Sequence, residues 1–236
     1  MSLRPFQLPR CPAPAWARAV FTGAPVAAAS FPESWHGVPF GPEDWRSLAR
    51  GQLVTDCAIT ALLRHFRRAL FRQDVAWLTP HQAWQLLRVH GLTPELRDPA
   101  HWRARINHPA PQWLLCPVHD PVLRHWTLLL YNYAQCAWHI YDGLPGSNAE
   151  EQAARLHFAL WGVADRDRVR ARHPRQVRRV DLALHQTDGH SCGAFVLAHI
   201  AALATGVALP TAQEEVDGVR LWCLSQAAAG CPGSNS

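Results

Sequence analysis

The sequence contains no lysine: all 23 of its basic residues are arginines. One interpretation is a coding bias that favours Arg, Ala, Pro and Gly, because charge alone rarely distinguishes the two cations at a protein surface. A chain without lysine also offers no side-chain amine to which a protein modifier can be attached. Both interpretations, compositional bias and protection from modification, stay open.

Long apolar runs are also absent, and charged residues make up only 17% of the 236. No stretch reaches the 18 apolar residues that a membrane-spanning helix needs. Residues 18–31 faintly resemble a signal peptide, but Thr22, Gly23 and Pro25 interrupt the apolar part. With 48% hydrophobic residues the chain is long enough for one buried core, so we expect a soluble protein with no membrane partner.

The seven cysteines never form a Cys-x-x-Cys pair, and their number is odd. Both facts argue against a disulfide framework and favour free thiols in a reducing compartment. We therefore expect an intracellular protein, cytoplasmic or nuclear.

Helical patterns dominate the first half of the chain. Residues 1–40 are rich in Pro and Ala and show no sustained period, which predicts an irregular extension. Apolar residues at three- and four-residue spacing predict a helix from Thr55 or Asp56 to Leu70. A proline at the first helical position and a capping-box glutamine then predict a helix from Thr79 to Gly91.

Strand patterns begin at Gln112, where three short aliphatic and aromatic runs are separated by turn-sized gaps: "QWLLCPVH", "HWTLLLYNY" and "AWHIYDG". The segment "VRRVDLAL" predicts a further strand. Helices are predicted from Cys192 to Ala204, ending at Gly206, and from Thr211 to Gln226. This order indicates an α+β domain.

Cys192 falls in the first turn of a predicted helix, where unpaired amides and the helix dipole favour a thiolate over a thiol. A nucleophilic cysteine also needs a base, a group that orients the base, and donors for the oxyanion. If the second and third strands pair as a hairpin, His125 and Asp142 meet at its open end. Gln186 precedes the cysteine loop and has a side-chain amide to offer to an oxyanion.

Three motifs carry a family resemblance: His125-Trp126, Tyr141-Asp142-Gly143, and "QTDGHSCG" at residues 186–193. They resemble the His-Trp, Tyr-Asp-Ser and Gln-x-Asn-Gly-x-Asp-Cys-Gly motifs of the ubiquitin-like-protein proteases, which include SUMO proteases and bacterial effector deubiquitinases. The resemblance extends to "DWRSLARGQLVTDCAITALLRHF" and to Arg220, and covers roughly residues 44 to 228. It implies a papain-like cysteine protease fold with a central mixed sheet flanked by helices.

The resemblance makes Cys192 the nucleophile, His125 the general base, Asp142 the orienting acid and Gln186 the oxyanion donor. It places the substrate's Gly-Gly tail against four residues: Trp126, Leu53, Asp56 and Gly193.

The sequence departs from the family at three positions. Leu53 stands where a tryptophan usually covers the tail, Asp188 replaces an asparagine, and Ser191 replaces an aspartate. The first departure bears on recognition of the tail, whereas the other two need not touch the chemistry.

Other histidines, a zinc-ligand spacing and an arginine-rich stretch are alternative functional features of the sequence. His185 and His190 flank the cysteine loop but have no evident orienting carboxylate in the sequence. Cys116 and His119 have a compact zinc-ligand spacing, but no second ligand pair appears, so no metal is expected. The arginine-rich stretch 164–180 lacks the interleaved aromatics that stack on bases, which favours a solvated connector over nucleic-acid binding.

The sequence therefore predicts an extension at 1–40, a protease domain at 41–228 and a tail at 229–236. We expect a monomeric cysteine protease without a cofactor that cleaves after the Gly-Gly of ubiquitin or a ubiquitin-like modifier, in the host cytoplasm if it is a secreted effector. The alternatives are an acetyltransferase on the same core, a viral-type maturation protease and an inactive modifier-binding module, the last disfavoured because all four reactive positions are filled.

Overall fold

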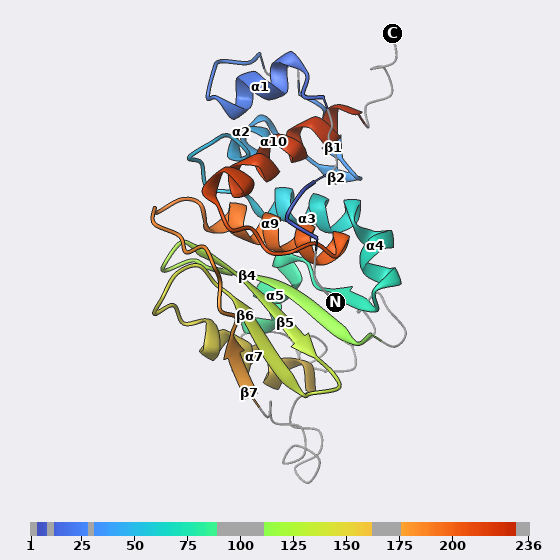
Figure 1. The fold of residues 1–236 in the computed structure, drawn as a ribbon, viewed down its shortest axis with the longest axis vertical. Helices are drawn as coiled ribbons and strands as arrows, with labels where there is room; N and C mark the ends of the chain where they lie inside the picture. Colours follow the sequence, from blue (N-terminus) through green and yellow to red (C-terminus); the bar gives the residue numbers. More distant parts are fainter. Residues whose placement is uncertain (1–3, 9–11, 28–30, 89–110, 162–175, 230–236) are drawn as a thin grey trace. The chain divides into compact units, whose positions relative to one another are not determined.

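The computed structural model describes residues 4–8, 12–27, 31–88, 111–161 and 176–229. The chain divides into two units, one formed by residues 1–67 with 182–236 and the other by residues 68–181 (Figure 1). None of the helices in the described ranges combines the length and apolar character that crossing a membrane requires.

The first unit is mainly helical. Helix α9 is buried along almost its whole length and packs against α3 and α10 (Figure 1). The elements of the first unit are α1 (Ala15–Phe21), β1 (Ser34–Trp35), β2 (Val38–Pro39), α2 (Pro42–Ser47), α3 (Asp56–His65), α9 (Cys192–Thr205) and α10 (Gln213–Ala229).

Local sequence signals set the ends of these helices. The Thr55 side chain accepts a hydrogen bond from the amide of Ala58 at 3.4 Å and caps α3, which ends at Phe66 before α4 (Arg67–Arg72) begins. Gly206 ends α9 in the left-handed conformation at φ 66°, which favours glycine. The sequence predicted Gly206 at the end of α9, and it predicted the cap of α3 as either Thr55 or Asp56.

Part of the segment expected to be irregular is ordered. Within residues 1–40, α1 and the β1–β2 hairpin form around buried aromatic rings. The ring centroids of Trp35 and Trp45 lie 6.2 Å apart, and the indole Nε1 of Trp45 donates to the carbonyl of Pro32. Contacts between segments distant in sequence stabilise this region, which is why it shows no local period.

The second unit contains a five-stranded mixed sheet in the order β3-β4-β5-β6-β7 (Figure 1). Strand pairs β3–β4 and β6–β7 are parallel, and β4–β5 and β5–β6 are antiparallel. The elements are β3 (Val75–Trp77), α5 (Pro80–Leu87), β4 (Trp113–Asp120), β5 (His125–Asn132), β6 (Ala137–Tyr141), α7 (Ala149–Trp161) and β7 (Gln176–Arg179). The predicted α+β class with a central mixed sheet is confirmed.

Helices α5 and α7 pack against one face of this sheet and form its core with alternate residues of β4, β5 and β6. Thr79 and Gln82 make the predicted capping box of α5. The predicted stop at Gly91 and most of the arginine-rich stretch lie outside the described residues, whereas 176–179 of that stretch form β7.

Arg220 in α10 is the largest charged side chain buried in the first unit, with none of its surface exposed. Its guanidinium donates to the carbonyls of Ser47, Ala49 and Gln52 at 2.9, 3.0 and 2.7 Å, and to that of His190 at 3.5 Å. Burial lowers the pKa of Arg220, but arginine stays protonated because its ordinary value is so high. One cation thus joins two loops to α10.

Replacing Arg220 should therefore destabilise the first unit, in which the guanidinium joins the two loops to α10. Arg220→Leu leaves the carbonyl groups without a donor and should lower the free energy of unfolding by about 3 kcal/mol. Arg155→Leu is the control, because the Arg155 side chain is 62% exposed and pairs with Glu151, which is 59% exposed; it should cost less than about 1 kcal/mol. Urea denaturation of both variants checks this, and equal losses would contradict the role given to Arg220.

Candidate active site

His125 and Asp142 form a hydrogen-bonded pair at the open end of the β5–β6 hairpin. The imidazole Nε2 of His125 lies 2.7 Å from Oδ1 of Asp142, and the two side chains are 5% and 0% exposed. The hairpin places them together because Leu128 pairs with Tyr141, directly before Asp142. A carboxylate only accepts, so Nε2 carries the shared proton and Nδ1 is the nitrogen that can act as a base.

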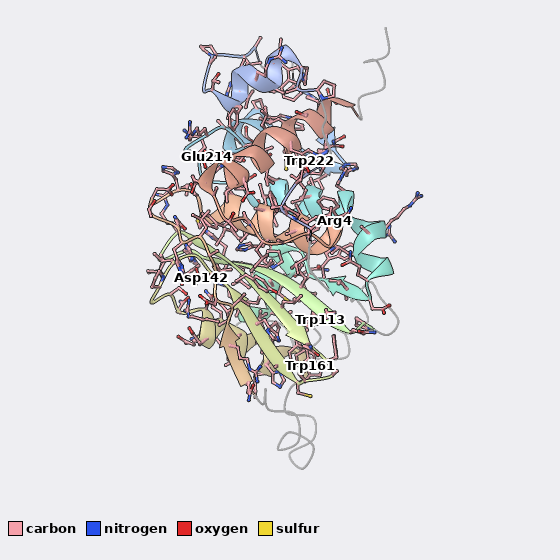
Figure 2. The ribbon with its side chains drawn as sticks, in the orientation of Figure 1. Arg4, Trp113, Asp142, Trp161, Glu214 and Trp222 are labelled. Atoms are coloured by element: carbon pink, nitrogen blue, oxygen red, sulfur yellow. The ribbon has the colours of Figure 1, made fainter. Side chains whose placement is uncertain are left out.

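The Asp142 carboxylate is held on both oxygens. Oδ1 also accepts from the amide of Leu144 at 2.9 Å, and Oδ2 accepts from the hydroxyl of Ser147 and from Nη1 of Arg179 at 3.3 Å. Burial by itself raises the pKa of Asp142, but the bonds from His125, Ser147 and Leu144 outweigh it and lower the pKa below its ordinary value. Asp142 is therefore an anion at neutral pH. Figure 2 shows it at the end of the sheet opposite to Trp113.

Cys192 is the first residue of α9 and is 2% exposed. The helix dipole places partial positive charge and unpaired backbone amides at this end, where they can stabilise a developing anion. No acidic residue occupies the first turn, so nothing within the helix opposes that effect.

The loop before Cys192 is organised by Asp188. Its Oδ1 accepts from the amides of His190 and Ser191 at 2.9 and 2.7 Å, and its Oδ2 accepts from the Ser191 hydroxyl at 2.6 Å. Burial raises the pKa of Asp188, but these three bonds and His190 lower it below its ordinary value. The two departures from the family motif in this loop thus bond to each other.

Gln186 lies in the same loop. Its Nε2 donates to the carbonyl of Asp188, and its buried Oε1 has no hydrogen-bond partner among the described residues. His185 is exposed. His190 differs from the sequence-based expectation, because its Nδ1 lies 3.4 Å from Oδ1 of Asp188. A carboxylate does stand beside His190, so this histidine needs its own control.

The residues expected to contact the substrate tail occupy three elements. Trp126 is buried in β5, next to His125, and its ring lies 4.7 Å from that of His119. Gly193 is buried in α9 beside Cys192, and Leu53 is half-buried in the loop before α3. Asp56 is exposed as the first residue of α3. Each unit therefore contributes part of the predicted set.

Three of the other four described thiols are poorer nucleophiles or lie deeper. Burial, together with Asp44 and Asp56, raises the pKa of Cys57 to about 11. Burial also raises the pKa of Cys116 and Cys223. In the described part of the chain, no cluster of three or more His, Cys, Asp or Glu side chains is arranged to hold a metal ion.

Two side chains that bind the Asp142 carboxylate were not expected from the sequence, Ser147 and Arg179. Asp188 was expected only as a departure from the family motif, whereas in the structure it fixes the cysteine loop. For Ser147 the available signal was a serine shortly after "YDG", where a hydroxyl can bond back to the acid. Arg179 gave no such signal, because it looks like one more residue of an arginine-rich stretch.

No model of a protein family matches the sequence, and no curated protein is significantly similar to it. Solved structures do match. The Ulp1 protease domain in complex with Smt3, the yeast orthologue of SUMO, is 13% identical with a TM-score of 0.63, covering 89% of this chain and 90% of that one.

The Chaetomium thermophilum Ulp1-like SUMO protease catalytic domain is 18% identical with a TM-score of 0.61, covering 94% and 92% of the two chains. This chain has the fold of the ubiquitin-like-protein proteases. The Xanthomonas campestris effector XopD, in a structure bound to ubiquitin, is 17% identical with a TM-score of 0.52, covering 72% of this chain and 90% of that one.

Because the pKa of Asp188 is lowered in the folded protein, its contribution to stability is present above the ordinary aspartate pKa and is lost as the pH falls through the folded value. Asp188→Asn should cost about 1 kcal/mol at pH 7, and this cost should shrink below about pH 4. Urea unfolding between pH 3 and 7 measures this cost in free energy of unfolding. Asp181→Asn, which removes an exposed carboxylate, should follow the unsubstituted protein; a cost for Asp188→Asn that does not change with pH would contradict the role of the charge.

Proposed function

We propose that this protein is a cysteine protease that removes or processes ubiquitin or a ubiquitin-like modifier after its C-terminal Gly-Gly. The observation that carries the proposal is the buried His125–Asp142 pair at 2.7 Å, in a chain whose Cys192 begins a buried helix. Structural neighbours of the same fold support the substrate class, since they include complexes with Smt3 and with ubiquitin.

In the proposed reaction, Nδ1 of His125 takes the proton from Sγ of Cys192, and the thiolate attacks the carbonyl carbon of the last glycine. The Gln186 amide and the backbone N–H groups at the start of α9 stabilise the oxyanion. The imidazolium then protonates the leaving amine as the C–N bond breaks, which leaves a thioester. Water, deprotonated by His125, hydrolyses the thioester and restores the thiol. This chemistry needs no cofactor.

The proposed setting is the inside of a cell, the host cytoplasm if the chain is a secreted effector. The catalytic residues do not determine which modifier is recognised, because that choice depends on surface loops. Ubiquitin, SUMO and other modifiers carrying C-terminal electrophiles are therefore the first probes to use. Acetyl transfer from acetyl-coenzyme A without any labelling would favour the alternative enzyme class on this core.

We expect an electrophilic modifier probe to label Cys192 and no other thiol. Cys192→Ala should abolish labelling and turnover while the protein stays folded. Cys57→Ala should label like the original protein, because a pKa of about 11 keeps that thiol protonated at neutral pH. Intact-protein mass spectrometry and peptide mapping identify the labelled residue, and a label on Cys57 or Cys136 would refute the assignment.

The base is tested in the same assay by two histidine variants. His125→Ala should lower kcat/KM nearly as much as loss of the thiol, and Asp142→Asn by about 10²-fold, because it disturbs the base without removing it. His190→Ala is the matched control, since His190 also lies beside a carboxylate. It should retain turnover within about threefold, the scale of an indirect effect on kcat/KM. The reverse order of the two histidine variants would assign the base to His190.

Leu53 should widen the tail channel relative to relatives with tryptophan at this position. Leu53→Trp should lower turnover of probes ending in Ala-Gly more than that of probes ending in Gly-Gly, because a larger wall excludes a methyl group. Trp126→Ala should raise KM and lower kcat by misplacing the tail. Equal discrimination by the original protein and Leu53→Trp, measured as the ratio of kcat/KM values, would show that another residue closes the channel.

A further inference from the structure

The carboxylate that orients the proposed base has a second set of partners, on the side away from His125. Asp142 is fully buried, with 0% of its side chain exposed. Its Oδ1 faces His125 and the amide of Leu144, whereas its Oδ2 faces Ser147 and Arg179. Rotation of the carboxylate about its Cβ–Cγ bond would break bonds on both oxygens, so its orientation is determined from both sides.

Arg179 reaches Asp142 from β7. Strand β7 runs parallel to β6 with Arg179 opposite Ile140, two residues before Asp142. The planar guanidinium donates hydrogen bonds to two different carboxylates. Nε and Nη2 bind the two carboxylate oxygens of Glu150 in α7 at 2.6 and 2.9 Å, and Nη1 points to Oδ2 of Asp142.

The same guanidinium also holds Ser147. Its Nη2 donates to the carbonyl and to the hydroxyl oxygen of Ser147 at 3.3 and 3.1 Å, while the Ser147 hydroxyl donates to Asp142. Arg179 therefore fixes Asp142 twice, directly and through Ser147. Lysine could not replace it, because one ammonium lacks the planar geometry that spans two carboxylates.

The Arg179 cation lies between two carboxylates. It faces Asp142 from β7, and Glu150 of α7 lies on its other side. The hydrogen bonds that Arg179 donates to Glu150 raise the pKa of Arg179 and lower the pKa of Glu150. The Arg179 side chain is only 33% exposed, so solvent screens the arrangement less than an open surface pair.

We propose that Arg179, acting with Ser147, is a positioning residue that clamps the Asp142 carboxylate so that Oδ1 stays on Nε2 of His125. The geometry of the clamp stands by itself, but its consequence for turnover rests on the proposed protease function. Neither residue touches the substrate or the reacting atoms in this scheme. Their effect passes through Asp142 to the orientation of the imidazole.

Two measurements test the clamp. The first is the kcat and KM of the best modifier substrate, where Arg179→Gln should lower kcat by about 10- to 100-fold and leave KM nearly unchanged, because orientation rather than binding is lost. The second needs no activity: NMR of histidine-labelled protein follows exchange of the Nε2 proton of His125. That proton should exchange slowly in the original protein and faster by tenfold or more in Arg179→Gln.

Arg178→Gln is the matched control, because Arg178 is the neighbouring exposed arginine of β7 and pairs in register with His139. It should leave kcat and the proton exchange within about twofold, the change expected when no shared partner is disturbed. Arg179→Lys should recover only part of the lost kcat. Full recovery with lysine would show that charge alone suffices and would overturn the bridging role.

Two gentler variants keep the test decisive if Arg179→Gln fails to fold. Ser147→Ala removes one hydroxyl, and Glu150→Gln loosens the far anchor of Arg179 without touching Asp142. Both should lower kcat and speed exchange in the same direction, by less than Arg179→Gln. Normal kcat and exchange in these folded variants would refute the clamp while leaving the protease function intact. Absent turnover in the original protein as well as in every variant, with the expected exchange pattern, would refute the function and leave the clamp.

Discussion

The buried guanidinium of Arg220 is the interaction on which the first unit depends. A cation with no exposed surface depends on protein groups for its hydrogen bonds, and here backbone carbonyls accept from both terminal nitrogens of the guanidinium, Nη1 and Nη2. Two of the loops that supply them, at Gln52 and His190, flank positions that the sequence assigns to the substrate tail and the nucleophile. The hydrogen bonds of one buried charge therefore also set the course of the backbone next to these two positions.

A buried anion plays the corresponding part in the second unit. The Asp142 carboxylate is as inaccessible as Arg220 and collects donors from β5, β7 and the loop that leads into α7. Loss of a single donor leaves a charge partly unsatisfied in a medium where water cannot replace the missing bond. The His125–Asp142 contact is consequently one edge of a network rather than an isolated pair.

Sequence patterns predicted the elements whose signals are local. Helix α5 has a proline and a capping box, and the β5–β6 hairpin has two clear strands around a short turn, so both were predictable. Helix α7 and strand β3 were not predicted: β3 has only three residues, too few to show a period, whereas α7 does begin with a helix-start signal, the acidic residues Glu150 and Glu151 in its first turn. The register of the β5–β6 hairpin follows from its turn alone, and this register places His125 beside Asp142.

The remaining parts of the site depend on contacts that no local pattern encodes. Arg179 reaches Asp142 through parallel pairing of β6 with β7, two strands separated by the whole of α7. The cysteine loop gives a subtler case. The family motif has an amide at position 188 and an acid at 191, whereas this chain has an acid at 188 and a hydroxyl at 191. Since Asp188 accepts from the hydroxyl of Ser191, each departure supplies what the other needs. Judged singly, each substitution looks like a loss of the motif. Together they leave a loop, immediately before Cys192, that is held by one hydrogen bond between the two side chains and by two hydrogen bonds from backbone amides to Asp188.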